Sequence, residues 1–334
     1  METSETPMTN QVSTMLLTTL IDAWTALAFG SGAQPSQPVR VARTNRRATG
    51  RFSTGLYRNG AGNLRYKLYV PASYDGTPMP LVVMLHGCRQ NADDFARGTA
   101  MNELAEQFGC LIVYPEQSRG ANWHGCWQWF DKAHHERGHG EPALIAGVTQ
   151  QIIDNYAVDR AHVGVAGLSA GGAMAVIMGR TYPDLFTAVG CHSGLAHGSA
   201  TSGHDAMLAM RNGVCVAPPQ SLAANGLPII VFHGDRDKTV HLNNSDCVVR
   251  QSIAGGPTPA TGVAQVVHSA PAAAARHAYT RTVHRRITGE VLAEQWTVHG
   301  AGHAWSGGSG RGSYTDADGP DASREMLRFF IARR

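Results

Sequence analysis

The chain has few charged residues and no long apolar run, and both shortages narrow the range of functions. Charged side chains make up 16% of its 334 residues, and the formal net charge is only +3. No Lys/Arg cluster is interleaved with aromatic residues, so the chain shows no sign of nucleic-acid binding. No apolar run is long enough to span a bilayer, and we predict no transmembrane segment. A hydrophobic content of 43% is instead sufficient for the core of one large domain.

The cysteines contain no C-x-x-C pair, which disfavours a structural zinc site. There are six of them, at Cys88, Cys110, Cys126, Cys191, Cys215 and Cys247. An even number permits disulfides but does not prove any, and buried thiols are the alternative. Spacing alone therefore leaves the pairing open.

One H-E-x-x-H match, His135 to His139, is typical of zinc proteases. That motif requires a helix, because only a helix brings its two histidines to one face. Gly138 and Gly140 oppose a helix here, and Pro142 follows closely. We interpret the segment as a polar loop and predict no metal, with a zinc hydrolase using His135 and His139 as a remote alternative.

Residues 1–50 differ from the rest of the chain. Residues 15–29 carry a helical apolar stripe, residues 30–37 are typical of a linker, and residues 40–51 are basic. A signal peptide needs a positively charged start, but the first fourteen residues contain two glutamates and no Lys or Arg. We predict a partly mobile N-terminal helix and linker for residues 1–50 and one folded domain for 51–334. A mis-assigned start before a genuine signal is the alternative.

From Thr54 onward, apolar runs alternate with amphipathic segments. Residues 80–85 form a continuous apolar run, as expected for a strand covered on both faces. Strands that alternate with helices indicate a mostly parallel central sheet with helices on both faces, an α/β fold. Residues 255–276, rich in Ala, Pro and Gly, are expected to form a variable excursion. The predicted strands are 64–70, 80–85, 110–114, 162–166, 188–191, 228–232 and 294–298, and the predicted helices are 95–108, 142–156, 173–182, 205–211, 243–253 and 321–331.

The pentapeptide GLSAG at residues 167–171 matches G-x-S-x-G between a predicted strand and a predicted helix. In that context the motif forms a nucleophile elbow, a tight turn that presents its serine above the sheet. A glycine-rich turn with an incidental serine is the alternative. We take Ser169 as the candidate nucleophile and the Ala170 N–H as a candidate donor to the oxyanion.

A serine nucleophile needs a base and an acid that orients it, and both follow later strands in the order Ser, Asp, His. The loop after residue 232 offers Asp235 and Asp237. Asp237 is preferred because Asp235, directly at the strand end, suits a turn cap. His303 lies between small residues on a loop that can reach back to Ser169. We predict a Ser169–His303–Asp237 triad.

The segment His86-Gly87-Cys88 follows the strand predicted at residues 80–85. It is similar to an H-G-G oxyanion motif with cysteine in place of the second glycine. We therefore assign the second oxyanion donor to the Cys88 N–H, beside that of Ala170.

Two tryptophans are candidate substrate-binding residues. Trp305 lies two residues beyond His303, and we expect it to pack on the substrate. Support of the histidine loop is the alternative. Trp127 belongs to an aromatic patch with Trp123 and its neighbours 129 and 130. The patch could line a wall for an apolar acyl chain, or it could anchor a long loop.

Together, these stretches resemble the polyhydroxybutyrate (PHB) depolymerase family of α/β-hydrolase esterases, which includes feruloyl and acetylxylan esterases. The resemblance runs from about Tyr66 to the C-terminus, through residues 85–106, 114–117, 126–130, 166–175, 192–195, 302–308 and 314–326. It implies an α/β-hydrolase catalytic domain over residues 51–334 that needs no cofactor. It also implies a serine esterase that acts on 3-hydroxyalkanoate polyester, its oligomers or related small acyl esters.

The resemblance has two further implications. It implies an extracellular or periplasmic protein, with a cytoplasmic location as the alternative because no clear signal peptide is present. It also suggests a disulfide between Cys88 and Cys126, whose loops leave the same edge of the predicted sheet. Reduced thiols are the alternative if the protein stays in the cytosol.

Other classes of function remain open at this stage. Feruloyl or acetylxylan ester hydrolysis would use the same triad, as would acyl transfer to alcohols. A catalytically silent binding module would not react at Ser169. The sequence predicts an ester substrate but no oligomeric state.

Overall fold

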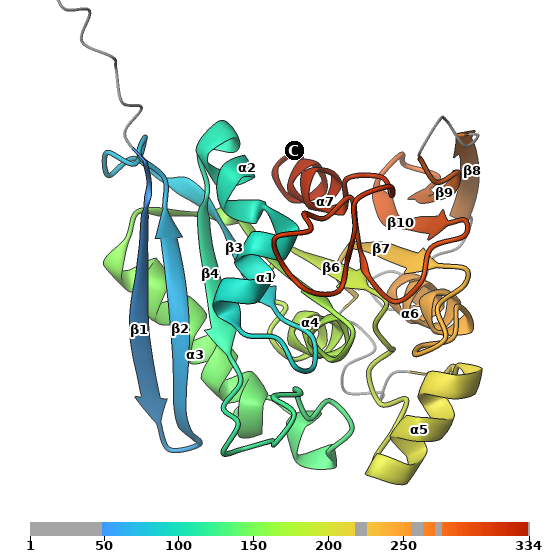
Figure 1. Cartoon of the computed structure of the whole chain (residues 1–334), viewed down its shortest axis with the longest axis horizontal. Helices are drawn as coiled ribbons and strands as arrows, with labels where there is room; N and C mark the ends of the chain where they lie inside the picture. The colour runs from blue at the N-terminus through green and yellow to red at the C-terminus, as the bar shows by residue number, and fades with distance from the viewer. Residues whose placement is uncertain (1–48, 218–225, 255–262, 271–275, 333–334) are drawn as a thin grey trace, which may run out of the picture. The chain divides into compact units, whose positions relative to one another are not determined.

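The computed structural model describes residues 49–217, 226–254, 263–270 and 276–332 (Figure 1). These residues form a ten-stranded sheet in the order β1-β2-β4-β3-β5-β6-β7-β10-β9-β8 and a small pair, β11-β12. The strands are β1 (Arg51–Asn59), β2 (Gly62–Val70), β3 (Met79–Leu85), β4 (Leu111–Glu116), β5 (Val158–Leu168), β6 (Ala188–His192), β7 (Ile229–Gly234), β8 (Val263–Ala270), β9 (Tyr279–Arg286), β10 (Val291–Val298), β11 (Trp305–Ser306) and β12 (Thr315–Asp316). The helices are α1 (Ala92–Thr99), α2 (Met101–Phe108), α3 (Gly140–Asn155), α4 (Ala170–Thr181), α5 (Gly203–Asn212), α6 (Asn243–Ala254) and α7 (Ala322–Ile331), with a 3₁₀ turn at Lys132–His134.

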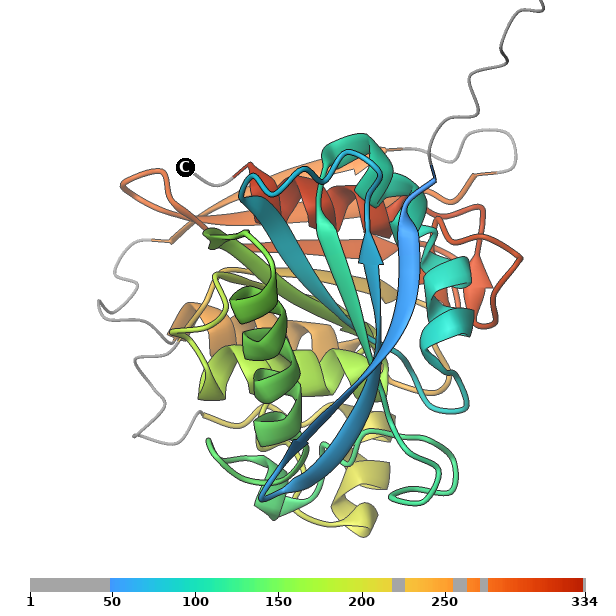
Figure 2. The same cartoon turned by 90° about the vertical axis from the view of Figure 1, so that its left-hand side faces the viewer.

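The centre of the sheet is parallel and buried on both faces. Strands β4, β3, β5, β6, β7 and β10 pair parallel in that spatial order. Along β3, Leu81, Val83 and Leu85 enter one core, whereas Val82 and Met84 enter the other. This alternation follows from the two-residue repeat of a strand. Helices α3, α4 and α6 cover the first face and α1, α2 and α7 the second (Figure 2).

The two edges of the sheet differ from the expectations drawn from the sequence. At one edge β1 pairs antiparallel with β2, and at the other β8 and β9 pair antiparallel next to β10. None of these three strands was predicted, and β8 lies inside the segment 255–276 that we expected to be an excursion. β1 is mostly exposed, so it lacks the apolar run that marks a buried strand.

The prediction of one continuous helix over residues 95–108 is wrong. This part of the chain forms two helices, α1 and α2, which meet at Ala100 in a left-handed conformation with φ of 50°. The apolar spacing continues through this residue, so periodicity alone carried no signal for the break.

The N-terminal helix predicted at residues 15–29 lies outside the described residues, and the boundary near residue 50 stays a prediction. Among the described helices, none combines the length and apolar content that a membrane crossing requires.

Candidate active site

Ser169 occupies a strained turn between β5 and α4, with φ of 56° and ψ of −119°. The turn needs glycine on both sides. A Cβ on Gly167 would lie 2.4 Å from the carbonyl of Gly171, and one on Gly171 would lie 2.1 Å from Leu85 O. The absence of side chains therefore lets the start of α4 approach the end of β3. Strain of this kind in a non-glycine residue is typical of a functional site.

His303 and Asp237, each on a loop that follows a strand, form a direct pair. His303 Nδ1 donates to Asp237 Oδ2 at 2.6 Å. The other carboxylate oxygen, Oδ1, accepts from the N–H groups of Thr239 at 2.8 Å and Val240 at 2.9 Å. A proton on Nδ1 leaves the Nε2 of His303 able to accept a proton.

The surroundings of Asp237 favour its charged form. Burial raises the pKa of its carboxyl group, but hydrogen bonds from His233 and His303 outweigh burial and hold that pKa well below its usual range. Asp237 therefore remains a carboxylate at any pH where His303 can act as a base.

Asp235, the other acid of this loop, has a different environment. Its carboxylate accepts from the Gly300 N–H at 2.7 Å and lies 2.9 Å from His299 Nδ1. Asp235 links the turn after β7 to the turn after β10. It is not among the described residues that line the cavity shared by Ser169 and His303.

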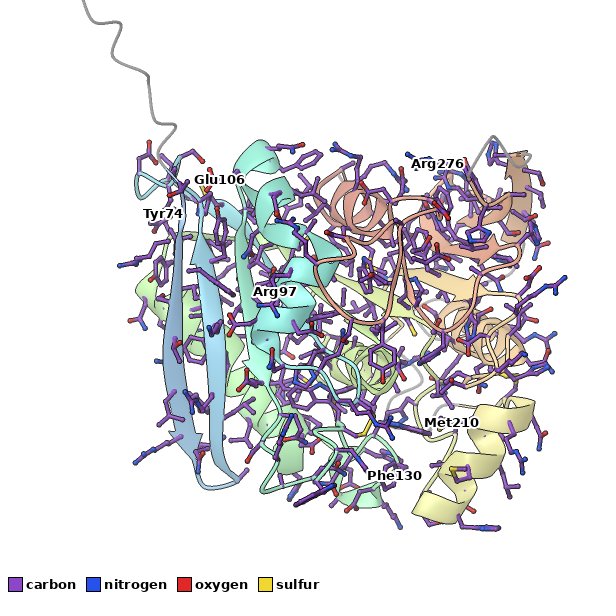
Figure 3. The ribbon with its side chains drawn as sticks, in the orientation of Figure 1. Tyr74, Arg97, Glu106, Phe130, Met210 and Arg276 are labelled. Atoms are coloured by element: carbon purple, nitrogen blue, oxygen red, sulfur yellow. A yellow bond between two sulfur atoms is a disulfide. The ribbon has the colours of Figure 1, made fainter. Side chains whose placement is uncertain are left out.

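Ser169 and His303 line one cavity of about 750 Å³ beyond the carboxyl ends of the parallel strands. One wall comes from α5 and another from the segment between β4 and α3. Figure 3 labels Met210 from the first wall and Phe130 from the second. The apolar part of the lining consists of Trp129, Phe130, Leu168, Ala206, Met207 and Met210.

The loop that carries Cys88 is held from several sides. Cys88 forms a disulfide with Cys126. The Nδ1 of His86 donates to Gly87 O at 2.9 Å, and its Nε2 accepts from the Gln117 N–H at 3.1 Å. The Gly87 N–H donates to Gln90 Oε1 at 2.9 Å. Preset backbone donors are effective because they need no reorganisation during reaction.

Two backbone N–H groups of the described residues, those of Cys88 and Ala170, have no hydrogen-bond partner. That of Cys88 has no hydrogen bond within the described part of the chain. That of Ala170 belongs to the first turn of α4, where helical amides have no intrahelical acceptor. Both residues adjoin Ser169 or the cavity that it lines, so both can bind developing negative charge.

A buried carboxylate supports the segment opposite Cys88. Glu141, in the first turn of α3, accepts hydrogen bonds from the side chain of Gln117 and, at 2.8 Å, from the Gln128 N–H. Gln117 also donates to Cys126 O at 3.2 Å. The sequence showed no signal for this network, because only the fold of the segment between β4 and α3 brings its members together.

Residues 135–139 form a loop and not a helix. His135 is buried, and its Nε2 donates to Trp129 O at 2.8 Å. His139 is exposed and precedes α3, while Gly138 and Gly140 have φ of 84° and 53°. The two histidines do not share a helix face, so the zinc-hydrolase alternative has no geometric basis. No group of three potential metal ligands occurs in the described ranges.

Trp305 and Trp127 are buried behind the cavity and do not line it. The ring of Trp305 stacks on His192 at 5.1 Å and meets Phe95 edge-on at 5.4 Å. Trp127 donates from Nε1 to His86 O at 3.1 Å. Neither ring has a surface left for substrate, which corrects the expected contact. Trp305 supports the histidine loop, and Trp127 supports the loop of Cys88.

Two further features of the structure were not predicted. Cys215 and Cys247 form a second disulfide, which links the segment after α5 to α6. Met207 and Met210 bring α5 to the cavity. Neither had a signal in the sequence, because both depend on where α5 packs.

Removal of the Cys88–Cys126 disulfide is expected to reduce both stability and turnover. The disulfide closes a loop of sequence separation 38, for which chain entropy gives a stabilisation of about 3–4 kcal/mol. The double variant Cys88→Ala/Cys126→Ala keeps the Cys88 N–H but loosens its position. We expect kcat to fall about tenfold, less than the roughly 10²–10³ that loss of a whole donor costs.

The matched control is Cys215→Ala/Cys247→Ala, which opens a loop of sequence separation 32 away from Cys88. Thermal denaturation and steady-state kinetics of both variants provide the comparison. We expect similar losses of stability and a smaller loss of kcat in the control. Equal losses of kcat would show that the first disulfide acts on stability alone.

Comparisons with known proteins give a consistent result. The family model described as esterase PHB depolymerase matches residues 64–269. Poly(3-hydroxyalkanoate) depolymerase C of Paucimonas lemoignei is 31% identical over 253 residues, which cover 72% of this chain and 58% of that protein. Poly(3-hydroxybutyrate) depolymerase of Ralstonia pickettii is 31% identical over 280 residues, with coverages of 77% and 55%. The chain thus spans little more than half the length of these relatives.

Among solved structures, an acetyl xylan esterase from Aspergillus awamori matches with a TM-score of 0.61 at 21% identity. The match covers 75% of this chain and 94% of that one. At this identity the similarity concerns the fold, and it confirms the predicted α/β-hydrolase fold with a mostly parallel sheet and helices on both faces.

Proposed function

This chain belongs to the esterase PHB depolymerase family, and on that premise we propose that it is a serine carboxylic-ester hydrolase. His303, oriented by Asp237, takes the proton from Ser169 Oγ as this oxygen attacks the ester carbonyl. The N–H groups of Cys88 and Ala170 stabilise the oxyanion. His303 then protonates the leaving alcohol, and water releases the acid from the acyl-enzyme.

One observation supports this proposal more strongly than any other. The His303–Asp237 pair and the strained Ser169 belong to three separate loops, yet Ser169 and His303 line the same cavity. A catalytically silent binding module has no need of a serine held in this conformation.

The substrates we propose are 3-hydroxyalkanoate oligomers, polyester or related small acyl esters. The apolar lining of the cavity suits the alkyl groups of such esters. The names of the two depolymerase relatives support the same class. We also propose an extracellular or periplasmic location, because the described residues contain two disulfides, which persist in oxidising compartments.

A hydrolysis panel, combined with active-site labelling, tests this function. We expect an organophosphonate probe to label Ser169, and p-nitrophenyl butyrate and 3-hydroxybutyrate oligomers to be hydrolysed faster than ethyl ferulate or acetylated xylose. Absence of labelling and of all ester hydrolysis would contradict the proposal. Acyl transfer to added alcohols that outpaces hydrolysis in water would instead identify an acyltransferase.

A further inference from the structure

A second hollow, of about 590 Å³, adjoins the catalytic cavity. Arg89 and His124 line both hollows, so the two share a boundary. The rest of the second lining consists of Arg119, Gly120 and Trp123. All five residues come from the loop after β3 and the segment between β4 and α3. A substrate longer than the catalytic cavity can therefore extend directly into this hollow.

The second hollow is cationic. Arg89 and Arg119 are exposed, and within the described ranges neither guanidinium group has a hydrogen bond or an ion pair. By contrast, the exposed Arg137 pairs with Asp184. Among the described residues that line either hollow, none is acidic. The positive charge next to the catalytic cavity is thus not compensated locally, and it favours an anionic group.

Trp123 adds an apolar surface to this cationic hollow. Its side chain is 85% exposed, unlike Trp127 and Trp129, which are buried. An indole at this exposure contributes little to the core, so its packing does not explain its presence. An arginine beside an exposed tryptophan suits a ligand that has a charged end and a short apolar part.

The backbone of Arg89 is fixed close to the oxyanion donor. Arg89 directly follows Cys88 and has φ of 66°, in the left-handed region. Its N–H donates to His124 O at 2.7 Å, next to the Cys88–Cys126 disulfide. Its side chain therefore starts from a rigid position one residue away from the group that binds the ester carbonyl.

We propose that Arg89, Arg119 and Trp123 form a subsite for the carboxylate end of a short hydroxyalkanoate oligomer, on the leaving-group side of the ester. This proposal rests on the proposed function of the same site. In an acid-ended dimer of 3-hydroxybutyrate, the carboxylate carbon is three bonds from the ester oxygen. With the ester carbonyl at the Cys88 N–H, that carboxylate comes within reach of Arg89.

The chemistry of the side chains matches the two parts of this leaving group. A guanidinium group binds a carboxylate through two parallel hydrogen bonds. Trp123 covers the methyl and methylene groups between the ester and the carboxylate. The subsite makes the protein selective for soluble, acid-ended oligomers over neutral esters of the same size.

The test compares two substrates of nearly equal shape, the acid-ended dimer of 3-hydroxybutyrate and its primary amide. Initial rates of product release give kcat/KM for each of the two substrates at low and at high salt. We expect the native protein to prefer the acid by about tenfold or more at low salt, and high salt to reduce this preference. Arg119→Gln and Arg89→Gln should each reduce the ratio of acid to amide about tenfold, and Arg89→Lys should restore part of it. Arg160→Gln is the matched control, because Arg160 is also exposed but lies at the end of β5 remote from Ser169.

The outcomes separate this subsite from the esterase activity itself. If neither dimer nor p-nitrophenyl butyrate is hydrolysed, the proposed function is wrong. If both dimers are hydrolysed equally well by the native protein, the subsite is wrong and the esterase stands. If both arginine variants keep the native ratio, the subsite is also wrong. Equal losses on acid and amide in Arg89→Gln would show a disturbed oxyanion loop, and an unchanged ratio in Arg119→Gln would then overturn the subsite.

Discussion

Ser169→Ala is expected to lower kcat for ester hydrolysis by about 10⁶-fold, because the members of a triad act as a unit. The loss should appear in kcat rather than KM, since the substituted side chain forms the bond to the substrate but contributes little to its binding. Steady-state kinetics with p-nitrophenyl butyrate provide the measurement. The same variant should lose all labelling by an organophosphonate probe.

Ser193 offers a matched control for the labelling. It also follows a strand, β6, and has a left-handed φ of 49°, but its side chain is buried and it is not among the lining residues of the cavity. Ser193→Ala should therefore still be labelled at Ser169, as peptide mapping by mass spectrometry can show. Labelling that survives in Ser169→Ala and disappears in Ser193→Ala would refute our choice of nucleophile.

Asp237→Asn is expected to lower kcat by about 10⁴-fold. An amide in this position can donate a hydrogen bond to His303 Nδ1, which places the imidazole proton on Nε2. The base would then have no free nitrogen facing Ser169.

The low pKa of Asp237 leads to a separate expectation for the pH dependence of the stability of the native protein. A depressed pKa contributes stability that is present above the unfolded-state value of about 3.9 and is lost as the pH falls below it.

Asp235→Asn is the matched control for this variant, since both acids lie on the loop after β7. Asp235 bonds to Gly300 and lies beside His299, away from Ser169, so we expect its replacement to reduce kcat by less than about tenfold. Kinetics of both variants with one substrate decide between them. A larger loss in Asp235→Asn would mean that the acid of the triad was chosen wrongly.

Much of this protein could be predicted from local patterns in its sequence. Apolar runs identified the central strands because a strand buried on both faces needs apolar side chains throughout. The motif around Ser169 and the positions of Asp237 and His303 after later strands also followed from the sequence. Parallel strands end at one edge of the sheet, so residues that follow them are brought close together whatever the loops do in between. Here the fold itself makes a long-range contact predictable.

Other features depended on contacts that no local pattern encodes. The exposed β1 and the strands β8 and β9 lack buried apolar runs, and they join the sheet by antiparallel pairing at its two ends. Trp305 and Trp127 are of a residue type that suits substrate binding, but both are buried because His192 packs against the first and His86 against the second. The second disulfide, the Glu141 network and the hollow of Arg89 and Arg119 each consist of residues that only the tertiary fold brings together. The sequence by itself thus determined the central strands and the candidate residues that follow them, because apolar periodicity and the order of motifs along the chain are local properties. Only the tertiary structure decided which side chains line the cavity, because exposure depends on every element that packs around them.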